Sequence, residues 1–92
     1  MGGFIVYISI SVEYLGFLQK IVDGKNSERL TLPAGATLTD LKRCIVNKYG
    51  EEKARIFYSC NYLINNRDTN LQQTLTLHDG DVLTPILSMQ GG

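Results

Sequence analysis

The residues with the most obvious chemical potential stand at the end of the sequence, where an apolar run leads into Gly91 and Gly92. Glycine makes up roughly 7% of average sequences, so two at the terminus have a chance probability of about half a per cent. No side chain of the tail has catalytic chemistry, which leaves the α-carboxylate of Gly92 as its reactive group. Because glycine lacks a Cβ atom, this carboxylate can enter a slot too narrow for other residues. We therefore expect the chain end to be the functional site.

The apolar stretch before the glycines predicts a surface for a partner. We expect Ile86 to belong to the core of the last strand. Leu87 and Met89 are expected beyond the cover of the sheet, where exposed apolar side chains suit a partner's groove. The residues expected to bind a partner are Pro85, Leu87, Ser88 and Met89, and those expected to thread into its active site are Gln90 and Gly91.

The composition limits the other functions that the chain could have. Ninety-two residues, 43% hydrophobic and 20% charged, are typical of one soluble globular domain. Nine basic and nine acidic residues cancel, and the densest basic cluster is Lys42-Arg43. Since nucleic-acid binding depends on neutralising phosphates, this balance argues against a nucleic-acid partner.

The cysteines do not predict a metal site. Cys44 and Cys60 are sixteen residues apart and the chain has one histidine, whereas a structural zinc needs about four closely spaced ligands. We expect two buried, reduced thiols, with a disulfide as the alternative. His78 stands in a polar turn without a neighbouring nucleophile, so it is not expected to act as a general base. No bound metal or cofactor is therefore expected.

The longest apolar-rich run, Phe4 to Val12, does not predict a membrane segment. It is too short to span a bilayer and lacks the basic region and cleavage site of a signal peptide. Val6 also stands where N-myristoylation would need Ser or Thr. The sequence indicates a cytoplasmic protein without a membrane partner.

The first half of the chain predicts two strands and one helix. Phe4 to Val12 is rich in β-branched and aromatic residues, and Glu28 to Leu32 alternates polar with apolar up to Pro33. The stretch between them should be a loop or short irregular strand around residues 19–22. Residues 37–49 predict the main helix: Thr37 is a good N-cap, and Gly50 supplies the stop. Its buried stripe should be Leu38, Leu41, Ile45 and Tyr49, and its outward residues Lys42, Arg43, Asn47 and Lys48.

The second half predicts two or three further strands. Residues 51–54 should be a polar connector, 55–60 a third strand and 62–64 a short fourth strand. Residues 65–68 indicate a turn that tolerates left-handed backbone, and 69–76 a helical turn that buries Leu71 and Leu75. A tight turn with a positive φ at Gly80 should precede the last strand, 82–87. The order predicts an α+β fold, a mixed four- to five-stranded sheet with one helix across it, as a domain of residues 1–86 followed by a flexible tail of residues 87–92.

Three features together resemble the ubiquitin-like β-grasp sulfur carriers of the MoaD and ThiS type. They are the order of elements, the turn Leu77-x-Asp79-Gly80-Asp81-Val82 before the last strand, and the terminal Gly91-Gly92. The stretch 32–41 also looks like the family's entry into its helix, and 59–62 like a short strand turn of the family. The overall pattern is most similar to the small subunit of molybdopterin synthase.

The resemblance implies a function for the tail. In this family an adenylating enzyme related to ubiquitin activators uses ATP to turn the terminal carboxylate into an acyl-adenylate. A sulfur donor then replaces AMP, leaving a thiocarboxylate for molybdopterin biosynthesis. By this resemblance Gly92 is the reacting residue, the chain is a co-substrate and not an enzyme, and a larger synthase subunit is a possible partner.

Other functions remain open at this point. The tail also resembles protein modifiers that are joined to lysines of target proteins, and a thiamine-pathway carrier would use the same chemistry. The Pro-Pro pair usual before the glycines in MoaD-type tails is replaced by Leu87-Ser88. A β-grasp adaptor that binds through its sheet and never uses its terminus is a third class.

Overall fold

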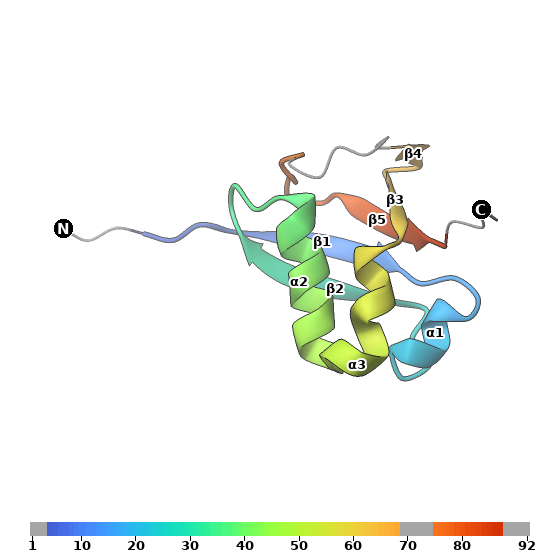
Figure 1. Ribbon diagram of the computed structural model, residues 1–92. Helices are drawn as coiled ribbons and strands as arrows, with labels where there is room; N and C mark the ends of the chain where they lie inside the picture. Colours follow the sequence, from blue (N-terminus) through green and yellow to red (C-terminus); the bar gives the residue numbers. More distant parts are fainter. Residues whose placement is uncertain (1–3, 69–74, 88–92) are drawn as a thin grey trace.

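The fold is a five-stranded mixed sheet with helices packed across one face (Figure 1). The computed structural model describes residues 4–68 and 75–87. The strand order is β2-β1-β5-β3-β4. In chain order the elements are β1 (Tyr7–Glu13), α1 (Leu18–Ile21), β2 (Ser27–Pro33), α2 (Leu38–Tyr49), α3 (Glu51–Ala54), the 3-10 helix η1 (Arg55–Tyr58), β3 (Asn61–Ile64), β4 (Arg67–Asp68) and β5 (Val82–Ile86). The predicted α+β class, mixed sheet and main helix are confirmed.

Strand β1 lies near the middle of the sheet, and its side chains point alternately to the core face and to the open face. Ile8, Ile10 and Val12 are buried, whereas Ser9 and Ser11 between them are half-buried. This alternation follows from the two-residue period of a strand, and the sequence predicted it. The strand pairs antiparallel with β2 along its whole length and parallel with β5 near its end.

Helix α2 closes the core over the sheet and matches the predicted bounds. The Thr37 hydroxyl accepts a hydrogen bond from the Asp40 amide at 3.4 Å, and the Asp40 carboxylate accepts one from the Thr37 amide at 2.8 Å. This reciprocal capping box satisfies two amides of the first turn. Gly50, at φ 100°, ends the helix as predicted. The buried apolar residues of α2 are Leu38, Leu41, Ile45 and Val46.

The largest error of the sequence prediction concerns residues 55–60. They were expected to form a strand, but 55–58 form η1, and the strand begins only at Asn61. Phe57 is fully buried while Tyr58 is exposed. The Phe57 ring packs edge-on against the Tyr14 ring, with 5.8 Å between the ring centres. In the short helix η1, one aromatic ring fills the core better than the alternating side chains of a strand would. Packing therefore overrides the β propensity of the segment.

Two further segments are helical where the sequence predicted a loop, strand or connector. Residues 18–21 form one turn, α1, because Leu18 and Ile21 stand three apart and are both buried. Residues 51–54 form α3 and bury Ala54. Asn65 and Asn66 have the predicted left-handed backbone, although the expected turn is shorter because β4 begins at Arg67.

Part of the segment before the last turn lies outside the described residues. The predicted helical turn, including Leu71, falls largely on residues 69–74, which are not described. Leu75 is half-buried, and Thr76 forms an isolated antiparallel bridge with Thr37. The chain returns to the sheet beside the start of α2.

A buried carboxylate joins β2 to the ends of β1 and α2. The Glu28 side chain is 7% exposed and accepts hydrogen bonds from the Tyr14 hydroxyl at 2.6 Å, the Tyr49 hydroxyl at 2.7 Å and the Lys48 ammonium at 2.7 Å. Burial alone would raise the pKa of this carboxyl group. The bonds from Lys48, Tyr14 and Tyr49 outweigh burial and lower the pKa from 4.5 to about 2.

We expect Glu28→Gln to destabilise the protein at pH 7 by about 1 to 3 kcal/mol. A carboxyl group with a lowered pKa in the folded chain stabilises the fold at pH above its ordinary value of 4.5, and this stabilisation is lost as the pH falls towards 2. The difference in unfolding free energy between wild type and variant should therefore shrink between pH 4.5 and 2. Urea denaturation followed by circular dichroism measures it, and a difference independent of pH would contradict the assignment.

Candidate functional site

Strand β5 leads to the predicted tail site and is paired on both sides. It lies between β1, with which it runs parallel, and β3, with which it runs antiparallel. Pro85 and Leu87 belong to the described residues, whereas Ser88, Met89, Gln90, Gly91 and Gly92 lie outside them. The structure therefore describes the base from which the predicted site starts.

The start of β5 is held by the turn Leu77-x-Asp79-Gly80-Asp81-Val82. The Asp79 carboxylate accepts a hydrogen bond from the Ser9 amide at 2.7 Å, and the Gly80 amide donates to the Ser9 carbonyl at 2.8 Å. Gly80 has φ 88°, which confirms the predicted left-handed position. The Asn65 side chain accepts from the Val82 amide at 2.9 Å and donates to the Asp81 carboxylate at 3.0 Å. These contacts fix the strand to β1 on one side and to the end of β3 on the other.

The end of β5 reverses two burial predictions. Ile86, expected in the core, is 36% exposed, while Leu87, expected outside the cover of the sheet, is half-buried and packs against the core. Leu83, Thr84 and Pro85 are all buried, and the two-residue period of a strand puts Leu87 on the side of Pro85 and Ile86 on the opposite side. The predicted partner-binding roles of Pro85 and Leu87 remain predictions, but their side chains point inward.

A lysine that the sequence analysis placed outside is buried near the end of β5. Lys42 is 4% exposed; its ammonium lies 3.5 Å from the Tyr58 carbonyl and 5.3 Å from the centre of the Tyr62 ring. Burial lowers its pKa, and the neighbouring Cys60 acts in the opposite direction. Tyr62 pairs with Pro85 in the sheet, so the ring that this cation faces belongs to the strand beside β5. Lys42 stands four residues after Leu38 and three before Ile45, so it shares their face of the helix. This spacing could have predicted its burial.

The thiols have the environment of structural residues. Both are free, as predicted; Cys60 is buried, whereas Cys44 is only half-buried. Burial raises the pKa of the Cys60 thiol to about 11, against the effect of Lys42, and burial also raises the pKa of Cys44. Thiols with raised pKa values are poor nucleophiles at neutral pH, so neither has the properties of a reactive cysteine.

The described residues offer no metal site. Within residues 4–68 and 75–87, no three His, Cys, Asp or Glu side chains gather as a metal site would require. No helix of this same part of the chain is long and apolar enough to cross a membrane.

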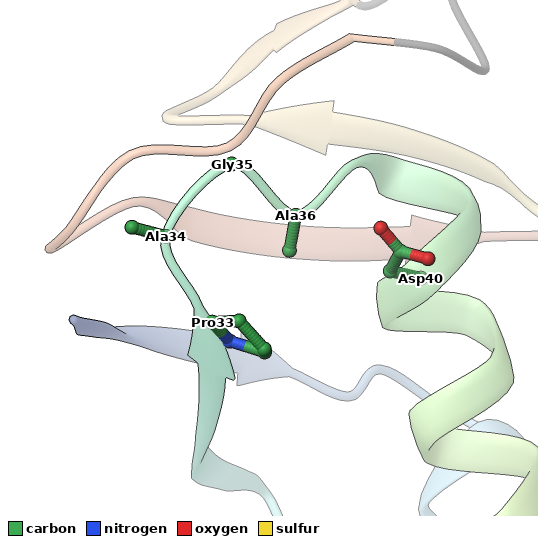
Figure 2. Close-up of a pocket in the computed structure, with 5 residues that line it drawn as sticks. All are labelled: Pro33, Ala34, Gly35, Ala36 and Asp40. Carbon is green, nitrogen blue, oxygen red and sulfur yellow. The ribbon is translucent and has the colours of Figure 1, made fainter. Parts of the chain in front are cut away.

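A shallow hollow lies beside the turn between β2 and α2, with a volume of about 340 Å³. Figure 2 shows that its lining consists of Pro33 at the end of β2, the next three residues 34–36, and Asp40 at the start of the helix. The Asp40 carboxylate already accepts hydrogen bonds from Thr37. Pro33 pairs with Tyr7 at the beginning of β1, so the hollow stands at the end of the sheet opposite to the tail. It is not part of the candidate site.

The architecture matches solved structures over most of the chain. No protein-family model and no curated protein matches the sequence. The solution structure of the Haloferax volcanii HVO 2177 protein is 22% identical, with a TM-score of 0.78 over 94% of this chain and 88% of that one. SAMP1 from Haloferax volcanii is 20% identical, with a TM-score of 0.72 over 91% and 99%. The complex of subunits 1 and 2 of the Helicobacter pylori molybdopterin-converting factor matches at 21% identity and a TM-score of 0.58, over 92% and 100%.

These matches define the class of fold. The protein has the ubiquitin-like β-grasp fold, as the resemblance of its sequence implied. Its structural neighbours include molybdopterin-converting factor subunits and small archaeal modifier proteins, the group to which the sequence resemblance pointed. At these identities the likeness establishes the fold, and the function is a separate question.

The reversed burial of Ile86 and Leu87 leads to a matched pair of variants. We expect Leu87→Ala to destabilise the protein by about 1 to 2 kcal/mol because it removes part of a core contact. Ile86→Ala should change the stability by less than about 0.5 kcal/mol, as is usual at an exposed site. Urea denaturation measures both, and equal losses of stability would show that the two faces have been wrongly assigned.

Proposed function

We propose that the protein is a sulfur carrier whose terminal Gly92 is adenylated and then converted to a thiocarboxylate for molybdopterin biosynthesis. One observation carries the proposal: the last strand of a β-grasp sheet, paired on both sides, ends at Ile86, and the sequence continues through residues 87–90 to Gly91-Gly92. The division into a domain of residues 1–86 and a tail of residues 87–92 belongs to this proposal. We also place the protein in the cytoplasm.

The proposed chemistry needs no catalytic side chain from this protein. A Gly92 carboxylate oxygen attacks the α-phosphorus of ATP, and pyrophosphate leaves. A sulfide-level sulfur then attacks the acyl carbon of the adenylate, a C–S bond forms, and AMP leaves with the oxygen of the broken C–O bond. Because a free carboxylate is a poor acyl donor, adenylation supplies the leaving group, and the enzyme supplies positioning and electrostatic stabilisation.

The proposed partners follow from these steps. A ubiquitin-activator-like adenylating enzyme binds and consumes ATP, and a separate sulfur donor supplies sulfide. A larger synthase subunit is a third proposed partner, which the complex of subunits 1 and 2 of the Helicobacter pylori factor supports. The chain acts as co-substrate, and Gln90 and Gly91 thread the carboxylate to the adenylating site while Met89 and Ser88 contact the partner.

A protein modifier is the second candidate function. The match to a small archaeal modifier protein favours it, because such a protein shares this fold and nearly the whole length of the chain. In this case the Gly92 acyl group would pass to a lysine amine of a target protein, forming an isopeptide bond. A thiamine-pathway carrier differs from the first candidate only in the acceptor of the sulfur.

Intact mass spectrometry of the protein purified from its native host distinguishes these functions. A sulfur carrier should show a fraction heavier by about 16 Da, because one terminal oxygen is exchanged for sulfur while the rest of the chain is unchanged. A modifier should instead appear in adducts of high mass. Both products should disappear when Gly92 is deleted.

A control keeps the test specific to the terminus. Phe4→Ser changes an exposed residue before β1, keeps the two glycines and should keep the product. Normal function in a host that carries the deletion of Gly91-Gly92 would eliminate both tail functions and leave the β-grasp adaptor.

A further inference from the structure

Two large apolar side chains are held in solvent at the turn that follows β1. Leu15 and Phe17 are 55% and 52% exposed, although their neighbours Tyr14 and Leu18 are buried. Exposed apolar side chains that occur singly need no explanation, but two in one turn, at the same end of the sheet as a third (Figure 1), indicate a contact surface. The third is Ile86.

Backbone hydrogen bonds hold this turn in place. Gly16, between the two apolar residues, has φ 55°, a conformation that glycine adopts without strain. The carbonyls of residues 15, 16 and 17 accept hydrogen bonds from the amides of residues 18, 19 and 20 at 3.0 to 3.1 Å. The Gln19 side chain also donates to the Tyr14 carbonyl at 2.9 Å. The apolar side chains are therefore presented by an ordered turn, which reduces the entropy lost when a partner covers them.

The turn lies at the same end of the sheet as the start of the tail. Strands β1 and β5 run parallel, with Val12 opposite Leu83. Leu15 and Ile86 each come three residues after this pair, Leu15 just beyond the end of β1 and Ile86 at the end of β5. Ile86 is the first exposed residue of β5 after buried Leu83, Thr84 and Pro85, and Leu15 is exposed two residues after β1 ends at Glu13. Figure 1 shows the turn before α1 and the end of β5 at this common end.

We propose that Leu15, Phe17 and Ile86 form the docking surface for the adenylating partner that acts on Gly92. This inference rests on the proposed function of the tail. Five residues follow Leu87 in the sequence, and five residues span at most about 18 Å. An enzyme that takes hold of the Gly92 carboxylate must therefore stand close to the end of β5, where this surface lies. Exposed Glu13 and Lys20 flank the surface, so its complement is an apolar patch with a polar rim.

The chain offers a matched control at the opposite end of β1. Phe4 is 94% exposed and precedes the start of β1, whereas Leu15 and Phe17 follow its end. Phe4→Ser removes an exposed aromatic ring as Phe17→Ser does, but far from the tail. The control thus separates the effect of position from a general loss of surface hydrophobicity.

The test compares three versions of the full chain, expressed in the native host from its own locus: wild type, the double variant Leu15→Ser/Phe17→Ser, and Phe4→Ser. Thermal denaturation first checks that all three are folded with similar midpoints. Intact mass then gives the fraction modified at Gly92, either as the product about 16 Da heavier or as adducts. Losing two anchors at the centre of an interface should lower this fraction at least about tenfold in the double variant and leave it unchanged in Phe4→Ser.

The outcomes separate the two hypotheses. If the wild type is modified and the double variant is modified equally well, the docking surface is wrong while the proposed function stands. If Phe4→Ser loses modification as much as the double variant does, the effect is not local and the assignment is also wrong. If even the wild type carries no modification at Gly92, the proposed function fails, and the docking surface fails with it.

Discussion

The parallel pairing of β1 with β5 is the constraint on which the arrangement of the molecule depends. It puts the last described strand inside the sheet, with β1 on one side and β3 on the other. Because the two strands run in the same direction, the end of β5 and the turn after β1 meet at one end of the sheet. The opposite end holds the exposed segment before β1 and the hollow beside the β2–α2 turn. The pairing therefore separates the tail from the other surface features.

The start of β5 shows how this pairing is secured. Parallel strands need a long connection, and here the chain passes through α2, η1 and β3 before it returns. The turn at residues 78–81 then bonds to Ser9, and Asn65 bonds to the first residue of β5. A turn motif that the sequence associated with a family thus has a direct mechanical role. It fixes the register of β5, and with it the face on which each later residue lies.

Local signals were sufficient for some elements and not for others. Helix α2 could be predicted because its cap, its buried stripe and its stop are all encoded within fourteen residues. Strand β1 could be predicted from the alternation of Ile8, Ser9 and Ile10. The helix at residues 55–58 could not be predicted, since it depends on burying Phe57 beneath elements distant in sequence. Tertiary packing decided the outcome there.

The candidate site shows the same division. The terminal glycines are visible in the sequence without any structure, because they depend only on residue type. Which of Ile86 and Leu87 faces the core depends on the register with β3, and no local pattern states it. Lys42 was misplaced because lysine is usually exposed; its long stem lets the residue occupy the buried stripe while the ammonium reaches the Tyr58 carbonyl.

A terminal carboxylate on two glycines is chemically similar to many chain ends, so the tail alone cannot provide specificity. Under the proposed function, the discrimination must come from contacts on the folded domain close to the tail. Leu15 and Phe17 are already about half-covered, so burying the rest of each contributes roughly 1 to 2 kcal/mol. Association costs at least about 4 kcal/mol in lost freedom of motion, which is as much as these two side chains contribute together or more, so they hold the partner only weakly. Such a surface favours short-lived binding, and a carrier must leave its activating enzyme once its terminus has been charged.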